Sequence, residues 1–138
     1  MPRVRITRRL HFSAAHRLAQ PEWDDEKNRR VFGDCANRNW HGHNYELDVT
    51  VAGPVDPDTG YVMDLKDLKD LVNRHVVDDL DHRNLNLDVS WLEGVLPSTE
   101  NLVMRIWERI EPHIPAPATL ERVVLWETPR HWVEYRGD

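Results

Sequence analysis

Two stretches of the chain alternate between apolar and polar side chains, with the period of two that a half-buried β-strand produces. Residues 4–16 place mostly apolar side chains on even positions and polar ones on odd positions, and this apolar face ends in His16. Residues 41–51 place His41, His43 and then apolar side chains on odd positions. The pattern predicts two strands, each carrying its histidines on the buried face.

Two later stretches follow the 3.6-residue period of an amphipathic helix. Asp64 is a suitable N-cap for the first helix, whose apolar residues recur over 65–80. The second helix begins with Ser98 or Thr99 as its cap and ends at Pro112. Each helix therefore has one face that packs and one that faces water.

Residues 120–135 contain two more strand-like runs around a turn at 128–130. The order ββααββ predicts an α+β fold, with two helices on one face of a four-stranded antiparallel sheet. No linker or short repeat interrupts the chain, so we expect a single domain over residues 1–138. Such a sheet has open edges, which predicts an oligomer that hides them.

The two N-terminal strands would bring their histidines together by pairing antiparallel, because the end of the first then lies beside the start of the second. His16, His41 and His43 would converge on one point. Three neutral imidazoles with a fourth position left free form the ligand set of an open zinc site. A single buried histidine is more often a core residue with its hydrogen bonds satisfied, but three in one place favour zinc.

Composition restricts the class of protein. The chain has 138 residues, a formal net charge of -6 and one cysteine. The acidic balance and the scattered basic residues argue against a nucleic-acid partner, and one cysteine forms no internal disulfide. No apolar run approaches the roughly 20 residues of a membrane span, and the start does not resemble a signal peptide. We therefore expect a cytoplasmic protein with no membrane partner.

The single thiol, Cys35, lies near the end of a long polar connection over residues 17–40, and connections of this length tend to be functional. Cys35 could be a fourth zinc ligand, a catalytic base or nucleophile, or a small buried hydrophobe. Its polar surroundings argue against the last, and a fourth protein ligand would close the zinc site. We favour a base whose pKa a nearby cation would lower.

Three ionisable residues outside the histidine trio could also take part in chemistry. Asp81 and His82 follow the first helix, where polar residues commonly finish a helix end, but a carboxylate can also tune an adjacent imidazole for proton transfer. Glu127 lies on the apolar face of its strand, which is costly unless the carboxylate meets donors. A ligand with an amidine-like edge could supply a donor pair. We interpret Trp126 and Trp132 as packing residues.

These residues fall within motifs that follow one another along the whole chain. The motifs are His11 to His16, Cys35 to His43, Gly60 to Leu65, Leu80 to Asn86, Pro97 to Asn101 and Trp126 to Thr128. Together they resemble the 6-pyruvoyl-tetrahydropterin synthase family. The resemblance implies the tunnelling fold, in which trimers close their sheets into a barrel and two trimers stack as a homohexamer with active sites between subunits.

The resemblance also implies a role for each candidate residue. Zinc would be bound by His16, His41 and His43. Cys35 would abstract a proton, and Glu127 would anchor the amino-pyrimidine edge of the pterin. The partner acid/base pair would be Asp81 and His82. The residues that would help to hold the pterin, and that also cap a helix, are Ser98, Thr99 and Glu100.

The activity implied by the resemblance is that of a zinc-dependent lyase, which converts 7,8-dihydroneopterin triphosphate to 6-pyruvoyl-tetrahydropterin with loss of triphosphate, as in tetrahydrobiopterin biosynthesis. The related 6-carboxy-tetrahydropterin synthase of queuosine biosynthesis uses the same substrate but releases acetaldehyde. Its cysteine usually lies closer to the His-Gly-His motif than Cys35 does to His41, which favours the pyruvoyl enzyme.

Two alternatives come from other functional classes. One is a non-catalytic module that binds zinc and a pterin, against which the joint presence of Cys35, Asp81 and His82 argues. The other is a zinc hydrolase on a related fold, such as a cyclohydrolase acting on GTP. The candidates for contacts to the triphosphate, by charge and neighbourhood alone, are Arg8, Arg9, Arg17 and Arg38.

Overall fold

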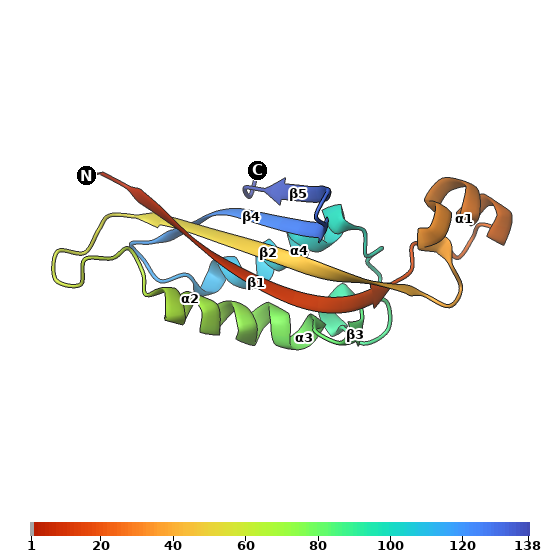
Figure 1. The fold of residues 1–138 in the computed structure, drawn as a ribbon, viewed down its shortest axis with the longest axis horizontal. Coiled ribbons are helices and arrows are strands. Elements are labelled where there is room, and N and C mark those ends of the chain that lie inside the picture. Colours follow the sequence, from red (N-terminus) through yellow and green to blue (C-terminus); the bar gives the residue numbers. More distant parts are fainter. Residues whose placement is uncertain (1) are drawn as a thin grey trace.

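The computed structural model describes residues 2–138 and shows one sheet with its long helices on one face (Figure 1). The long strands are β1 (Val4–His16), β2 (His41–Gly53), β4 (Thr119–Thr128) and β5 (His131–Tyr135). They pair antiparallel in the order β1-β2-β4-β5. The predicted α+β architecture is confirmed.

A short additional strand extends the sheet beyond the predicted strands. β3 (Arg83–Asn84) pairs in parallel with Ala14 and Ala15 of β1, so that the full order is β3-β1-β2-β4-β5. A strand of two residues is too short to show a hydrophobic period, so the sequence does not predict it. It nevertheless fixes the chain after the first long helix against the end of β1.

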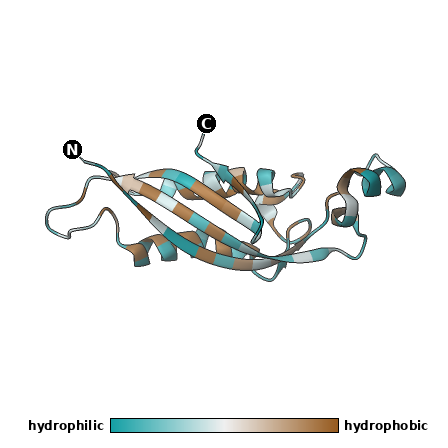
Figure 2. Ribbon diagram, turned by 45° about the horizontal axis from the view of Figure 1, so that its top comes forward, coloured by the Kyte–Doolittle hydropathy of each residue, from teal (hydrophilic) through white to brown (hydrophobic). Residues whose placement is uncertain are grey.

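The register of β1 and β2 determines where the histidines lie. The strands pair continuously from Val4 opposite Gly53 to His16 opposite His41. The expectation that the end of the first strand lies beside the start of the second is therefore confirmed. Hydropathy alternates along these strands, because one face packs against helices and the other does not (Figure 2).

The helical layer contains both predicted helices. Its segments are α2 (Leu65–Val72), a π-helical stretch (Asn73–Val77), α3 (Asp78–Leu80) and α4 (Thr99–Ile110). The side chain of Asp64 accepts a hydrogen bond from the N–H of Lys66, and Ser98 accepts one from Asn101. Asp64 and Ser98 are therefore the caps. α4 is followed by a 3-10 turn over Glu111–His113.

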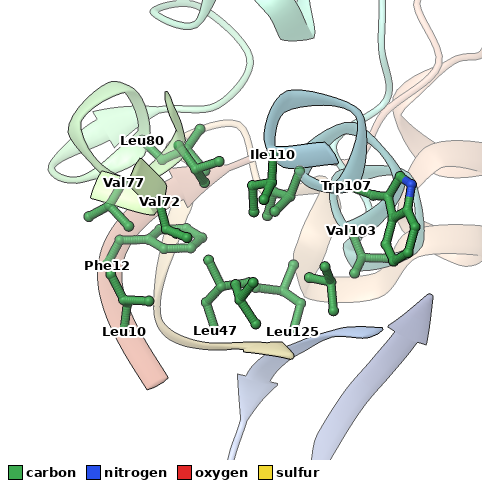
Figure 3. Packing of buried hydrophobic residues seen from close by; sticks show 14 of the residues in the cluster. Leu10, Phe12, Leu47, Val72, Val77, Leu80, Val103, Trp107, Ile110 and Leu125 are labelled. Carbon is green, nitrogen blue, oxygen red and sulfur yellow. The ribbon is translucent and has the colours of Figure 1, made fainter. Parts of the chain in front are cut away.

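The core fills the space between sheet and helices (Figure 3). Leu10, Phe12, Leu47 and Leu125 of the strands face side chains of the helices, which include Val72, Leu80, Val103 and Ile110. Burying one such side chain contributes about 1.5–3 kcal/mol. Within residues 2–138, no helix has the length and apolar character that a membrane crossing requires.

The connection over residues 17–40 contains a helix that the sequence does not predict, because it is short and mostly polar. α1 (Asp25–Phe32) is capped by Asp24, continues into a 3-10 turn over Gly33–Ala36, and projects beyond the end of the sheet (Figure 1). The chain then returns to the site, where the N–H of Leu18 donates a hydrogen bond of 2.7 Å to the carbonyl of Cys35.

Candidate functional site

The three histidines converge at the end of β1 and the start of β2. Nε2 of His41 lies 3.2 Å from Nε2 of His16 and 3.0 Å from Nε2 of His43. A metal ion bound tetrahedrally by nitrogens at about 2.0–2.1 Å would separate those nitrogens by about 3.3 Å. The trio therefore fits a metal ion with little movement of the side chains.

The surroundings of His16 determine which of its nitrogens carries the proton. His16 is fully buried, and its Nδ1 lies 2.9 Å from the carbonyl oxygen of Pro97. A carbonyl only accepts, so Nδ1 donates and the neutral ring presents its Nε2 lone pair to the trio, as metal-binding histidines do. Burial lowers the pKa of His16 and of His43, which favours neutral imidazoles able to bind a metal.

Cys35 and Glu127 lie against this trio. The Sγ of Cys35, a ring nitrogen of His16 and a carboxylate oxygen of Glu127 are all within 4.8 Å of one another. Oε1 of Glu127 is 3.2 Å from Nε2 of His43, and its other carboxylate oxygen accepts a hydrogen bond from Thr99. A thiol, a carboxylate and a candidate metal centre thus meet in one place.

The Cys35 thiol needs a positive neighbour in order to act as a base. It lies half-buried in the 3-10 turn over Gly33–Ala36. Burial, followed by the negative charges of Glu127 and Asp34, raises the pKa of the thiol. A cation bound to the histidines would lower that pKa and so favour the thiolate.

A cavity of about 420 Å³ opens beside Glu127 and is lined by Thr99 and Glu100 at the start of α4. Its volume lies in the range of small-molecule pockets. The side chain of Ser98, the third residue expected to hold the ligand, instead caps α4. Arg130 and Trp132 also line the cavity, although no motif marks them. Their position on the turn and strand that follow Glu127 is the only sequence signal that points to them.

His82 lines a different cavity from Glu127, and the candidate metal ligand His43 lines the cavity of His82 as well. Oδ1 of Asp81 accepts a hydrogen bond of 2.9 Å from the N–H of Ser13, and Oδ2 lies 3.1 Å from Nδ1 of His82. The Ser13 hydrogen bond, together with that to His82, lowers the pKa of Asp81. The His82 side chain is 83% exposed and lines a cavity with Ser13 and Asn44, which hydrogen-bond to each other on the helix-free face of the sheet.

Tyr45 belongs to the site although the sequence analysis did not single it out. It is fully buried, its ring stacks on Phe12 at 4.8 Å, and it meets His43 edge-on at 5.6 Å. Its hydroxyl has no hydrogen-bond partner within residues 2–138. The sequence pattern does indicate its place, because Tyr45 follows His43 by two residues and so lies on the same face of β2.

Comparison with known proteins identifies relatives over almost the whole chain. The family model described as 6-pyruvoyl tetrahydropterin synthase matches residues 5–138. The human 6-pyruvoyl tetrahydrobiopterin synthase is 42% identical over 135 residues, which cover 98% of this chain and 92% of the human one. The solved 6-pyruvoyl tetrahydropterin synthase of Caenorhabditis elegans superposes with a TM-score of 0.92 at 39% identity, covering 100% of this chain and 98% of that one.

One relative carries the name of a different activity. The dihydroneopterin monophosphate aldolase of Pyrococcus furiosus is 37% identical over 132 residues, 96% of each chain. Sequence and fold nevertheless agree over nearly the full length with the synthases. The chain therefore belongs to the 6-pyruvoyl tetrahydropterin synthase family.

Proposed function

We propose that this chain is a zinc-dependent 6-pyruvoyl tetrahydropterin synthase, a lyase that converts 7,8-dihydroneopterin triphosphate to 6-pyruvoyl-tetrahydropterin with release of triphosphate. The observation that carries the proposal is that Cys35, Glu127 and His16, which also belongs to the histidine trio, present ligand atoms within 4.8 Å of one another. A base, an anchor for the pterin ring and a metal would then act on one bound substrate.

Zinc is the metal that the donor set favours. Three neutral imidazole nitrogens leave one tetrahedral position for a substrate oxygen. The ligands would be His16, His41 and His43. Zinc, when bound, would polarise the side-chain oxygens of the substrate and acidify the adjacent carbons.

The protein side chains bind the substrate and transfer the proton. The Glu127 carboxylate accepts two N–H groups from the amino-pyrimidine edge of the pterin, in place of its hydrogen bond from Thr99. Thr99 and Glu100 then flank the ring at the start of α4. The thiolate of Cys35 takes a proton from a side-chain carbon of the substrate, triphosphate leaves with its bonding electron pair, and tautomerisation yields the pyruvoyl group.

We infer that Asp81 and His82 serve the site of a neighbouring copy in a homohexamer built as a dimer of trimers. Two features support this: His82 lines a cavity that neither Cys35 nor Glu127 lines, and its side chain is exposed. His82 also has a φ of 60°, a costly conformation for a non-glycine residue that often marks functional sites. The outer strand β5, only five residues long, supplies an open edge for assembly.

Mixing two inactive variants tests the shared site. Cys35→Ala and His82→Ala are each expected to be inactive, but dissociated and reassembled together they should recover part of the wild-type activity, because some mixed sites then contain both intact residues. A mixture that stays inactive, although native mass spectrometry shows mixed hexamers, would place Cys35 and His82 in the site of one chain.

The decisive test of the activity is anaerobic incubation of the zinc-loaded protein with 7,8-dihydroneopterin triphosphate, followed by mass identification of the product. We expect a pyruvoyl product without acetaldehyde. A carboxy product with acetaldehyde would assign the enzyme to queuosine biosynthesis, and formate release from GTP would indicate a cyclohydrolase. Cleavage of dihydroneopterin monophosphate would match the name of the Pyrococcus relative, and pterin binding without turnover would indicate a binding module.

A catalytic free thiol suits a reducing compartment such as the cytoplasm.

A further inference from the structure

A third cavity, of about 520 Å³, lies within the connection between β1 and β2. Three guanidinium groups from separate segments line it: Arg17 directly after β1, Arg29 in α1, and Arg38 just before β2. We propose that this cavity binds the triphosphate chain of the substrate through these arginines. The inference rests on the proposed function, because that function supplies the phosphorylated ligand.

Arg17 connects this cavity with the site that contains His16 and Cys35. It follows the candidate metal ligand His16 in the chain, and its Nε donates a hydrogen bond of 3.1 Å to the carbonyl of Ala36, the residue after Cys35. The side chain of Asn86 holds the backbone of Arg17 on both sides, with hydrogen bonds of 2.9 Å to its N–H and to its carbonyl. The guanidinium is thus fixed beside the turn that carries Cys35, and its two terminal amino groups are available to an anion.

The other two arginines extend the positive charge away from the centre. Arg38 forms an ion pair with Asp25, and both side chains are largely exposed. Glu26 is the second acid of the lining, so three cations face two carboxylates. An exposed ion pair contributes little, and a guanidinium binds a phosphate through two parallel hydrogen bonds. A triphosphate can therefore replace Asp25 as the partner of Arg38.

The remaining arginine candidates do not suit this role. Nε and Nη2 of Arg9 both bind the carboxylate of Asp48, at 2.7 and 2.9 Å. Arg8 lies eight residues before His16 on the same strand, about 26 Å along it. Arg29 is absent from the charge-based candidates, because only the fold of α1 brings it to Arg17 and Arg38.

Calorimetric binding of inorganic tripolyphosphate tests the cavity without requiring turnover. The double variant Arg29→Ala/Arg38→Ala should raise the Kd at least tenfold relative to the wild type. Arg30→Ala is the matched control: it removes a neighbouring charge from α1 that does not line the cavity, and it should change the Kd less than twofold. Equal Kd values for the wild type and the double variant, or no binding by the wild type, would overturn the proposal.

A gain of affinity provides a second, opposite test. Asp25→Asn frees Arg38 and removes a negative charge from the lining, so it should tighten tripolyphosphate binding severalfold. Weaker or unchanged binding would contradict the exchange of Asp25 for phosphate. With the pterin triphosphate, the double variant should raise KM at least tenfold and leave the affinity for unphosphorylated 7,8-dihydroneopterin unchanged. Failure of the proposed function would instead appear as tripolyphosphate binding by a wild type that does not turn the substrate over.

Discussion

Replacing His16 with alanine should separate the metal's contribution to stability from that of the protein itself. Nδ1 of His16 donates to the carbonyl of Pro97, immediately before the Ser98 cap of α4, and Nε2 belongs to the candidate metal trio. His16→Ala therefore removes a candidate metal ligand. It also leaves a buried carbonyl without its donor.

The two effects can be estimated separately. A buried carbonyl without a partner costs about 1–3 kcal/mol, and the cavity left by a fully buried side chain adds to that cost. Lost metal binding removes about 4 kcal/mol when free zinc exceeds its Kd about 1,000-fold. The variant should thus be less stable by at least about 1–3 kcal/mol in a chelator and by at least about 5–7 kcal/mol in zinc, with the cavity cost added in both conditions.

Urea unfolding with and without a chelator, together with metal analysis of the purified protein, measures both effects. His82→Ala is the matched control, because it removes an imidazole that is 83% exposed and outside the trio. The control should keep the metal content and stability of the wild type. If His16→Ala also kept one metal per chain and the same dependence on zinc, the assignment of His16 as a ligand would be refuted.

Four further outcomes are expected. Cys35→Ala should retain zinc and lower kcat by about 10²–10⁴-fold; loss of zinc would identify Cys35 as a ligand. Glu127→Gln should weaken pterin binding by about 1.5–3 kcal/mol, measured by fluorescence titration, and an unchanged Kd would contradict its role as the anchor. Leu125→Ala, fully buried in the core, should cost about 2–5 kcal/mol in urea unfolding; a loss well below this would mean that the core there is loosely packed. Burial lowers the pKa of His16 below its ordinary value of 6.5, so the unfolded chain binds more protons than the folded one. The metal-free protein should therefore gain stability as pH rises to 6.5. A His16→Phe variant should lose this part of the pH dependence, which urea midpoints would measure.

Local pattern determined the long strands, the main helices and the convergence of the histidines. Alternation with a period of two places side chains on one face wherever a strand forms. Given antiparallel pairing, the end of the first strand then lies beside the start of the second, as it does where His16 pairs with His41. Caps such as Asp64 are also predictable, because a cap bonds to backbone only two or three residues away.

Some segments have no regular hydrophobic period, and only the tertiary structure decided which of these segments lie close together. The path of residues 17–40 through α1 joins Arg29 to Arg17 and Arg38. The pairing of β3 with β1 places Asp81 and His82 beside Ser13. These placements depend on contacts between residues far apart in sequence, which local hydrophobic period does not encode. The sequence by itself thus determined which residues could carry the chemistry, and the tertiary structure decided which of them meet.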